Sequence, residues 1–337
     1  MSKYTVRGSS ELDDKIDADL EHITRTVAPH CNAGILLGGY GRGEGTPFIL
    51  SDGTQTPFND YDLVVIVGTV NTAVRLHFND LERQLTQEIG LPVDLCPYAL
   101  SELPSREFSL LNYEMKYGHI VLWGSDDVLN AMPAYPHDAI PRFEGSRLLL
   151  NRGKLLLDIK QRLKKSDPLT AEERIRFIKF IHKARLAFGD CALLAFGQYN
   201  ISYAIKRQRI TDIDECPSRD AVVEGFLKAI DLKEWGNFQA LADFDIAAEY
   251  RKTADLFLQF FPWYRAQHKA VECSLPKALA LNLRWNGRPL PRHPRLYLYD
   301  ALMELLKEGP SEFQLKQTLF SADNLVERFY LLQRRFS

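Results

Sequence analysis

The chain has 337 residues, of which 45% are hydrophobic and 26% are charged. These proportions exclude a disordered or fibrous chain, and the length suits two folded domains. The net charge of −2 is unevenly distributed: residues 1–144 carry 10 Lys+Arg against 21 Asp+Glu, a balance of −11, and residues 145–337 carry 32 against 23, a balance of +9. This asymmetry fits an acidic metal-binding half beside a half that binds anions, or two ordinary solvated surfaces.

The cysteines exclude two further classes of protein. Their number is odd, they are scattered along the chain, and they contain no C-x-x-C pair: Cys31, Cys96, Cys191, Cys216 and Cys273. A disulfide framework and a zinc site are therefore not expected. The N-terminal segment lacks the apolar core of a signal peptide, and no apolar run approaches the roughly 20 residues of a membrane span. We expect a cytoplasmic protein with reduced thiols and no membrane association.

The first half predicts a small mixed sheet with flanking helices. Leu12, Ile16, Leu20 and Ile23 recur at helical spacing. In chain order the expected elements are a helix over 10–27, a strand over 34–37, a glycine turn, a hairpin or loop over 46–58, a strand over 62–67, a helix over 71–89, a strand over 91–98, a helix over about 106–116 and a strand over 119–124. The fold class of residues 1–143 is therefore α+β.

The second half predicts a separate all-α domain over residues 144–337. Helical periodicity with few turn signals extends over 145–164, 170–209, 218–234, 242–266, 294–308 and 310–334. The Pro/Arg-rich run 286–294 predicts a loop.

The residues with chemical potential lie in the first half. Residues 38–44 read Gly-Gly-Tyr-Gly-Arg-Gly-Glu, a turn whose exposed backbone N–H groups are suited to phosphates. Asp60 and Asp62 stand at the head of an apolar strand, and because side chains alternate along a strand, both point to one face. Asp94 lies in the next apolar run. Three carboxylates can hold two Mg²⁺ ions, with Mn²⁺ as an alternative, and such a pair of ions supports phosphoryl or nucleotidyl transfer.

Two better-known nucleotide motifs are absent. The glycines do not match G-x-G-x-x-G, and G-x-x-x-x-G-K-[ST] occurs nowhere in the chain. The Rossmann and P-loop interpretations therefore fail on spacing.

The glycine turn, the Asp-x-Asp pair and the third acid together resemble the DNA polymerase β-like nucleotidyltransferase superfamily, most closely its aminoglycoside and minimal nucleotidyltransferases. The resemblance covers residues 30–125 and implies that Gly38, Gly39, Tyr40 and Arg42 bind the nucleotide. It implies that Asp60, Asp62 and Asp94 are the catalytic residues and hold the metal ions. One departure stands out: Gly39 and Asp60 are 21 positions apart, about twice the usual spacing, and the hairpin over 46–58 fills the gap.

The helical half has weaker signals. Lys183 is a candidate for reaching the triphosphate, with a solvated helix surface as the alternative. Tyr199 and Tyr203, four residues apart, are expected to share a helix face. His182 is expected to be a partly buried histidine rather than a base. The basic run 206–209 forms only a small patch for RNA.

These observations predict a magnesium-dependent enzyme that transfers a nucleoside monophosphate, expected to be AMP from ATP, to a hydroxyl of a small molecule or a protein. Asp94 is the expected general base. Two alternatives stay open: transfer to RNA such as tRNA, which the basic half allows but does not favour, and a non-catalytic nucleotide-binding or antitoxin-like protein.

Overall fold

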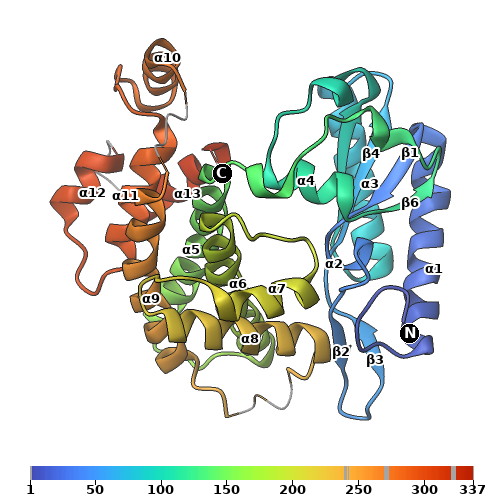
Figure 1. The fold of residues 1–337 in the computed structure, drawn as a ribbon, viewed down its shortest axis with the longest axis horizontal. Helices are drawn as coiled ribbons and strands as arrows, with labels where there is room; N and C mark the ends of the chain where they lie inside the picture. Colours follow the sequence, from blue (N-terminus) through green and yellow to red (C-terminus); the bar gives the residue numbers. More distant parts are fainter. Residues whose placement is uncertain (1, 239–240, 242, 269–272, 320–323, 337) are drawn as a thin grey trace. The chain divides into compact units, whose positions relative to one another are not determined.

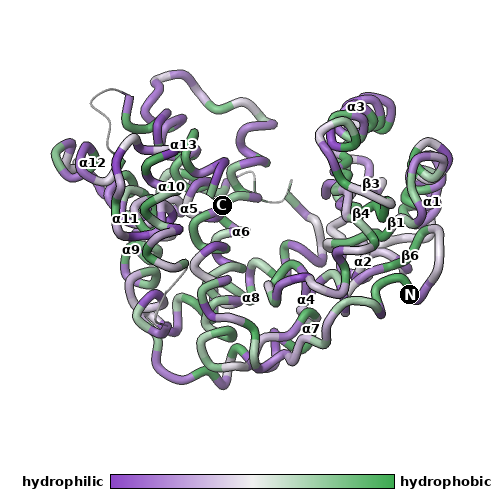
Figure 2. Tube along the Cα trace, turned by 90° about the horizontal axis from the view of Figure 1, so that it is seen from above, coloured by the Kyte–Doolittle hydropathy of each residue, from purple (hydrophilic) through white to green (hydrophobic). Residues whose placement is uncertain are grey.

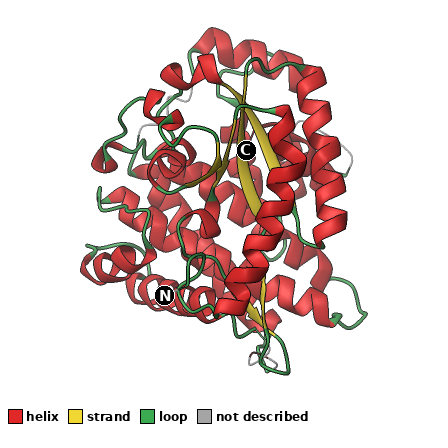
Figure 3. Cartoon of the chain, turned by 90° about the vertical axis from the view of Figure 1, so that its right-hand side faces the viewer, coloured by secondary structure: helices red, strands yellow, loops and turns green. Residues whose placement is uncertain are grey.

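A computed structural model describes residues 2–238, 241, 243–268, 273–319 and 324–336. The chain is a mixed α/β protein in which helices predominate and strands form a small part (Figure 3). It divides into two compact units. Unit 1 comprises Met1–Pro141, Gly197–Arg209 and Ile230–Ala242, and unit 2 comprises Arg142–Phe196, Ile210–Ala229 and Asp243–Ser337.

Unit 1 is built on a four-stranded mixed sheet (Figure 1). The strand order is β5-β4-β1-β6, with β4 and β5 parallel and β1 antiparallel to both β4 and β6. A separate hairpin pairs β2 with β3. The elements are α1 (Ser10–Val27), β1 (Ala33–Leu36), α2 (Gly38–Gly41), β2 (Pro47–Ile49), β3 (Gln55–Pro57), β4 (Tyr61–Val67), α3 (Thr72–Ile89), β5 (Val93–Ala99), α4 (Leu110–Tyr117), β6 (Ile120–Trp123) and α7 (Tyr203–Arg209).

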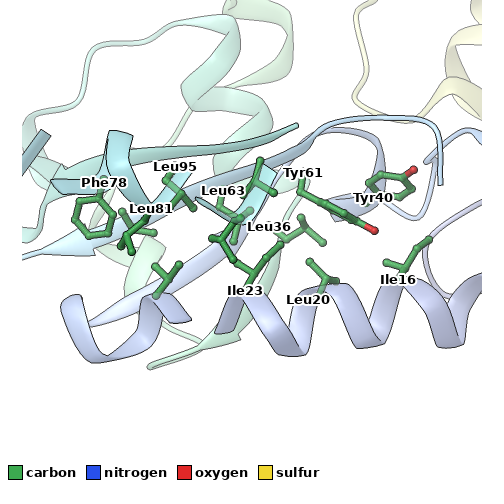
Figure 4. Close-up of a cluster of buried hydrophobic side chains, with 14 of the residues drawn as sticks. Ile16, Leu20, Ile23, Leu36, Tyr40, Tyr61, Leu63, Phe78, Leu81 and Leu95 are labelled. Carbon is green, nitrogen blue, oxygen red and sulfur yellow. The ribbon is translucent and has the colours of Figure 1, made fainter. Parts of the chain in front are cut away.

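One face of this sheet packs against α1 and α3. Alternate residues of β4 enter the core, where Tyr61 and Leu63 meet Ile16, Leu20 and Phe78 (Figure 4). Figure 2 shows α1 and α3 beside the strands, with hydrophilic and hydrophobic residues interspersed along both helices, as expected for amphipathic helices. Because a strand repeats every two residues, the positions between these core residues point to the opposite face of the sheet.

The exposed edge of the sheet is closed by α3. Strand β5 is an edge strand, and its N–H groups at Val93 and Leu95 donate to Thr86 Oγ1 at 3.1 Å and to Glu82 Oε1 at 2.7 Å. Pro97, the next residue with this orientation, has no N–H group. This edge therefore has little capacity to pair with another strand.

The described elements of unit 2 are helical. They are α5 (Phe143–Leu163), α6 (Ala171–Ala195), the first part of α8 (Arg219–Trp235), α9 (Ile246–Ala266), α10 (Leu275–Asn286), α11 (Pro294–Leu306), α12 (Glu312–Leu319) and α13 (Leu325–Phe336). One short 3₁₀ helix, Ile210–Asp212, also belongs to unit 2. The other short 3₁₀ helices belong to unit 1, at Ala28–His30, Leu100–Ser105, Val128–Ala131 and His137–Ala139. Among the described residues, none of the helices combines the length and apolar character needed to cross a bilayer.

Most predicted elements are confirmed to within a few residues, but the second half differs in three places. The predicted helix over 170–209 is interrupted between α6 and α7, where Gly197 has a φ of 68° that continues no right-handed helix. Helix α10 was not predicted. The predicted helix over 310–334 is two helices, α12 and α13, and its residues 320–323 lie outside the described residues, as does residue 242 of the predicted helix over 242–266.

The division into units also differs from the predicted boundary at residue 143. The first unit ends its main segment at Pro141 but recruits two later segments, around α7 and the end of α8. Tertiary contacts explain this recruitment: the N–H of Tyr203 donates to Glu44 Oε1 at 2.7 Å, and Phe238 packs on Phe58 with ring centroids 4.4 Å apart. Helical periodicity does not report contacts of this kind.

Candidate functional site

Three carboxylates converge on the sheet face opposite the α1–α3 core. Asp60 immediately precedes β4, Asp62 lies on β4, and the parallel register aligns Asp62 with Asp94 on β5. One carboxylate oxygen from each residue lies within 4.8 Å of the others, in the only such group of three found among the described residues. The predicted convergence of these three acids is therefore present in the structure.

The charges in this group oppose one another. The pKa of Asp94 is raised by partial burial and, secondarily, by the negative charge of Asp60. The pKa of Glu82 is also raised by burial, although its bond from the N–H of Leu95 offsets part of the shift. Carboxylate oxygens at this spacing fit a hard divalent cation such as Mg²⁺ or Mn²⁺, whose charge would relieve the repulsion.

The glycine turn lies beside the carboxylates. It forms the short helical turn α2, which follows β1, and Gly38 has a φ of 66° that favours glycine. A Cβ at Gly38 would stand 2.5 Å from Asp62 Oδ2, and a Cβ at Gly39 would stand 3.1 Å from the Nζ of Lys233. A side chain at Gly38 would therefore meet a carboxylate, and one at Gly39 would meet the ammonium group and the backbone of Glu44 and Gly45, each at 3.1 Å.

The backbone of this turn retains donors. The first N–H of the turn to donate a hydrogen bond within the described residues is that of Gly41, to the carbonyl of Leu37 at 3.0 Å. The N–H groups of Gly38 and Gly39 are thus left for an acceptor such as a phosphate oxygen.

Tyr40, predicted to bind nucleotide, is buried beneath the site and bonds to the backbone there. Its side chain is 1% exposed, and its hydroxyl accepts hydrogen bonds from the N–H groups of Phe58 at 2.9 Å and Asn59 at 3.1 Å. These two residues directly precede Asp60. Tyr40 therefore holds the backbone that presents the first carboxylate.

Arg42, also predicted to bind nucleotide, is enclosed by acids. Its guanidinium lies 3.5 Å from Glu44 and 3.2 Å from Glu114. Tyr199 donates from its hydroxyl to Glu114, and Glu44 accepts from the N–H of Tyr203. Arg42 thus links the glycine turn to α4 and to the segment around α7, and its contact with phosphate stays a prediction.

The prediction that Tyr199 and Tyr203 share a helix face is wrong, because Tyr199 precedes α7 and only Tyr203 belongs to it. The two rings nevertheless meet through Lys206. Its ammonium lies 4.2 Å from the ring centroid of Tyr199 and 4.5 Å from that of Tyr203, and the residue is 1% exposed. Cation–π contacts thus accommodate a buried charge at this point.

Two candidates belong to unit 2. Lys183 lies on α6 and is partly buried, and its contact with a triphosphate stays a prediction. His182 is buried, and its Nδ1 lies 2.8 Å from the carbonyl of Ile178. Burial lowers the pKa of this histidine to about 4, which fits a structural residue better than a base at neutral pH.

Sequence analysis missed Lys233. This lysine lies near the end of α8, in the part of the helix that belongs to unit 1. Lys233 follows Gly39 by 194 residues (233 − 39), so no motif spacing in the sequence connects them. Only the packing of the unit brings the two residues together.

Comparison with known proteins adds no assignment: no family model matches the chain, and no curated protein resembles it significantly.

Proposed function

We propose that this protein is a magnesium-dependent nucleotidyltransferase that moves a nucleoside monophosphate, with ATP as the expected donor, to a hydroxyl group of a small molecule or a protein. The observation that carries the proposal is the group of three carboxylates directly beside a glycine turn that has no room for side chains. A metal site alone is compatible with many functions. A metal site beside backbone N–H donors can bind a polyphosphate, because the metal ion and the N–H groups both contact phosphate oxygens.

Different residues bind the nucleotide and the acceptor hydroxyl. The N–H groups of Gly38 and Gly39 bind phosphate oxygens, while Asp60 and Asp62 hold magnesium against the triphosphate. Asp94 completes the acceptor side. Bound magnesium would neutralise phosphate charge and make the acceptor hydroxyl more acidic.

The transfer itself is an in-line displacement at the α-phosphorus. The acceptor oxygen forms a bond to this phosphorus while the bond to the bridging oxygen of the leaving pyrophosphate breaks. The hydroxyl proton passes to the carboxylate of Asp94 and from there to water.

The proposal includes the domain roles and the location. Unit 1 corresponds to a nucleotidyltransferase catalytic domain of the polymerase β-like kind, and unit 2 to an all-α domain that contributes to acceptor recognition. All five cysteines are free thiols, which supports a cytoplasmic location.

Nucleotide binding is tested first, by isothermal titration of Mg-ATP. Wild type should bind, and the double variant Asp60→Ala/Asp62→Ala should not. Asp14→Asn, which neutralises an exposed acid on α1, is the matched control and should bind as wild type does. Equal affinity of the double variant and wild type would contradict the proposal.

Transfer is tested next, by incubating the protein with cell extract and ATP labelled at either the α- or the γ-phosphate. Label from the α-phosphate in a metabolite or protein supports the proposal, and in tRNA-sized RNA it supports the RNA alternative. Label from the γ-phosphate indicates a kinase. Binding without any transfer indicates a non-catalytic nucleotide-binding protein.

A further inference from the structure

The inserted hairpin between the glycine turn and the carboxylates packs against the end of α8 (Figure 1). The N–H of Ile49, on β2, lies 3.4 Å from the carbonyl oxygen of Gly236, just beyond α8. A Cβ at Gly236 would stand 1.8 Å from the carbonyl oxygen of Pro47, so glycine is required for this approach. The hairpin and the helix end are therefore in direct backbone contact.

An aromatic cluster seals the same contact. Phe238 is 5% exposed, and its ring centroid lies 4.4 Å from that of Phe58 and 6.1 Å from that of Phe48. On the neighbouring side, the guanidinium of Arg7 lies 4.4 Å from the ring of Trp235. These contacts fix the end of α8 against the hairpin, because aromatic pairs add to the stabilisation from apolar burial.

The last turn of α8 carries Lys233 to the glycine turn. The Nζ of Lys233 lies 3.1 Å from the place a Cβ would take at Gly39, while Asp62 Oδ2 lies 2.5 Å from the place it would take at Gly38. A carboxylate thus lies beside Gly38, and an ammonium group lies beside Gly39 together with the backbone of Glu44 and Gly45. A phosphate chain bound along the turn would contact both.

Two other cations lie near the turn. Arg42 is paired with Glu44 and Glu114, and Lys206 is enclosed by two tyrosine rings and is 1% exposed. Lys233 is partly exposed, and its ammonium lies 5.6 Å from the ring centroid of Tyr203 and 3.1 Å from the place that a Cβ would take at Gly39.

We propose that Lys233 binds the outer phosphates of the nucleoside triphosphate, and that the β2–β3 hairpin, through Gly236 and Phe238, is the positioning element that holds this lysine at the glycine turn. The proposal rests on the proposed function and deepens it. It also assigns a role to the 21-residue separation between Gly39 and Asp60: the added residues form the surface on which the end of α8 is fixed.

The lysine is tested by the affinities of ATP and AMP in the presence of magnesium. Lys233→Ala should weaken ATP binding by about 10- to 100-fold, the range of a charge-assisted hydrogen bond, and leave AMP binding unchanged. Lys233→Arg should restore part of the loss. Lys228→Ala, which removes a lysine earlier on α8, is the matched control and should bind ATP as wild type does.

The hairpin is tested by Phe238→Leu, which keeps a buried apolar side chain, and by the double variant with Lys233→Ala. If Phe238 acts by positioning the lysine, the single variant loses affinity for ATP but not AMP, and the double variant binds ATP no more weakly than Lys233→Ala alone. Additive losses, or an equal loss for AMP, would overturn the positioning role. If Phe238→Leu does not fold, Phe48→Leu on the hairpin provides the same comparison.

These results separate the two proposals. Normal ATP binding by Lys233→Ala, together with loss of binding by Asp60→Ala/Asp62→Ala, overturns the role of Lys233 and leaves the proposed function standing. Normal binding by both overturns the proposed function.

Discussion

The two units treat their polar groups differently. In unit 2, Asn282 and Glu304 are buried polar side chains that are satisfied locally. The amide nitrogen of the buried Asn282 lies within hydrogen-bond distance of three carbonyl oxygens, those of Ala278 at 2.9 Å, Leu290 at 3.1 Å and Arg292 at 2.7 Å. Glu304, also buried, accepts from the N–H of Ser311 and from Lys307, both at 2.6 Å. Such groups cap and connect helices.

Unit 1 instead contains polar groups whose placement costs folding free energy. Three carboxylates gather at one sheet face, and Arg42 Nε and Glu44 Oε2 are buried with no hydrogen-bond partner among the described residues, 3.5 Å from each other. Arrangements that cost folding free energy are typical of functional sites, since stability alone would select against them. This difference supports placing the proposed function in unit 1.

The largest expected effect is on the stability of unit 1. Arg42→Ala should lower the free energy of unfolding by about 3–5 kcal/mol, because Glu44 and Glu114 lose the buried cation that compensates them. Urea denaturation measures the loss. The comparison variant is Arg162→Ala in unit 2, whose guanidinium makes a bidentate pair with Glu173 at 2.7 and 2.9 Å.

The loss in Arg162→Ala should be smaller. Glu173 keeps its hydrogen bond from the N–H of Thr170 at 3.0 Å and stays at the N-terminus of α6, where a negative charge is favourable. Equal losses in the two variants would remove the distinction between the units.

The next effect is on catalysis. Asp62→Asn should reduce turnover by more than about 100-fold, because removing a direct metal ligand should exceed the 10- to 100-fold losses typical of outer-shell residues. It should change the apolar core little, since Asp62 is not a member of the buried cluster that packs on α1 and α3. Steady-state kinetics with the acceptor found by label transfer measures the loss. Full activity in this variant would show that the three carboxylates serve another purpose.

The sequence could predict those parts of the site that depend on residues close together in the chain, and it could not predict those that depend on distant ones. Asp60, Asp62 and Asp94 could be found because strand alternation and parallel pairing are local rules that place them on one face. The burial of Arg42 between Glu44 and Glu114 could not be found, because Glu114 lies 72 residues away in the chain. Lys233 was missed for the same reason, and Tyr199 was misplaced because Gly197 ends the preceding helix.

The third effect is on the pH dependence of unit 2. Burial lowers the pKa of His182 to about 4 from its ordinary 6.5. Between these values the unfolded chain binds a proton that the folded chain does not, so stability falls as the pH falls through this window. At pH 5 the loss should be about 2 kcal/mol relative to pH 7. His182→Phe should flatten this part of the profile in urea denaturation, and an unchanged slope would assign it to other groups.

The smallest expected effect concerns Asp94, whose pKa is shifted in the opposite direction from that of Glu173 in unit 2. Burial and the charge of Asp60 raise the pKa of Asp94, so its ionised form destabilises the metal-free protein. This cost is absent below the unfolded-state pKa, develops as the pH rises from that value to the folded-state pKa, and is complete above it. Asp94→Asn should therefore raise the melting temperature at pH 7 without magnesium, by about 1–3 °C.

Magnesium should reverse this order. Wild type should gain more stability from the ion than Asp94→Asn does, because binding to the folded state adds stability in proportion to affinity. The same substitution should abolish transfer. Asp14→Asn, which neutralises an exposed acid outside the site, should respond to magnesium as wild type does. If Asp94→Asn is less stable than wild type without magnesium, the carboxylate of Asp94 stabilises the fold. Its ionisation then does not destabilise the metal-free protein as predicted.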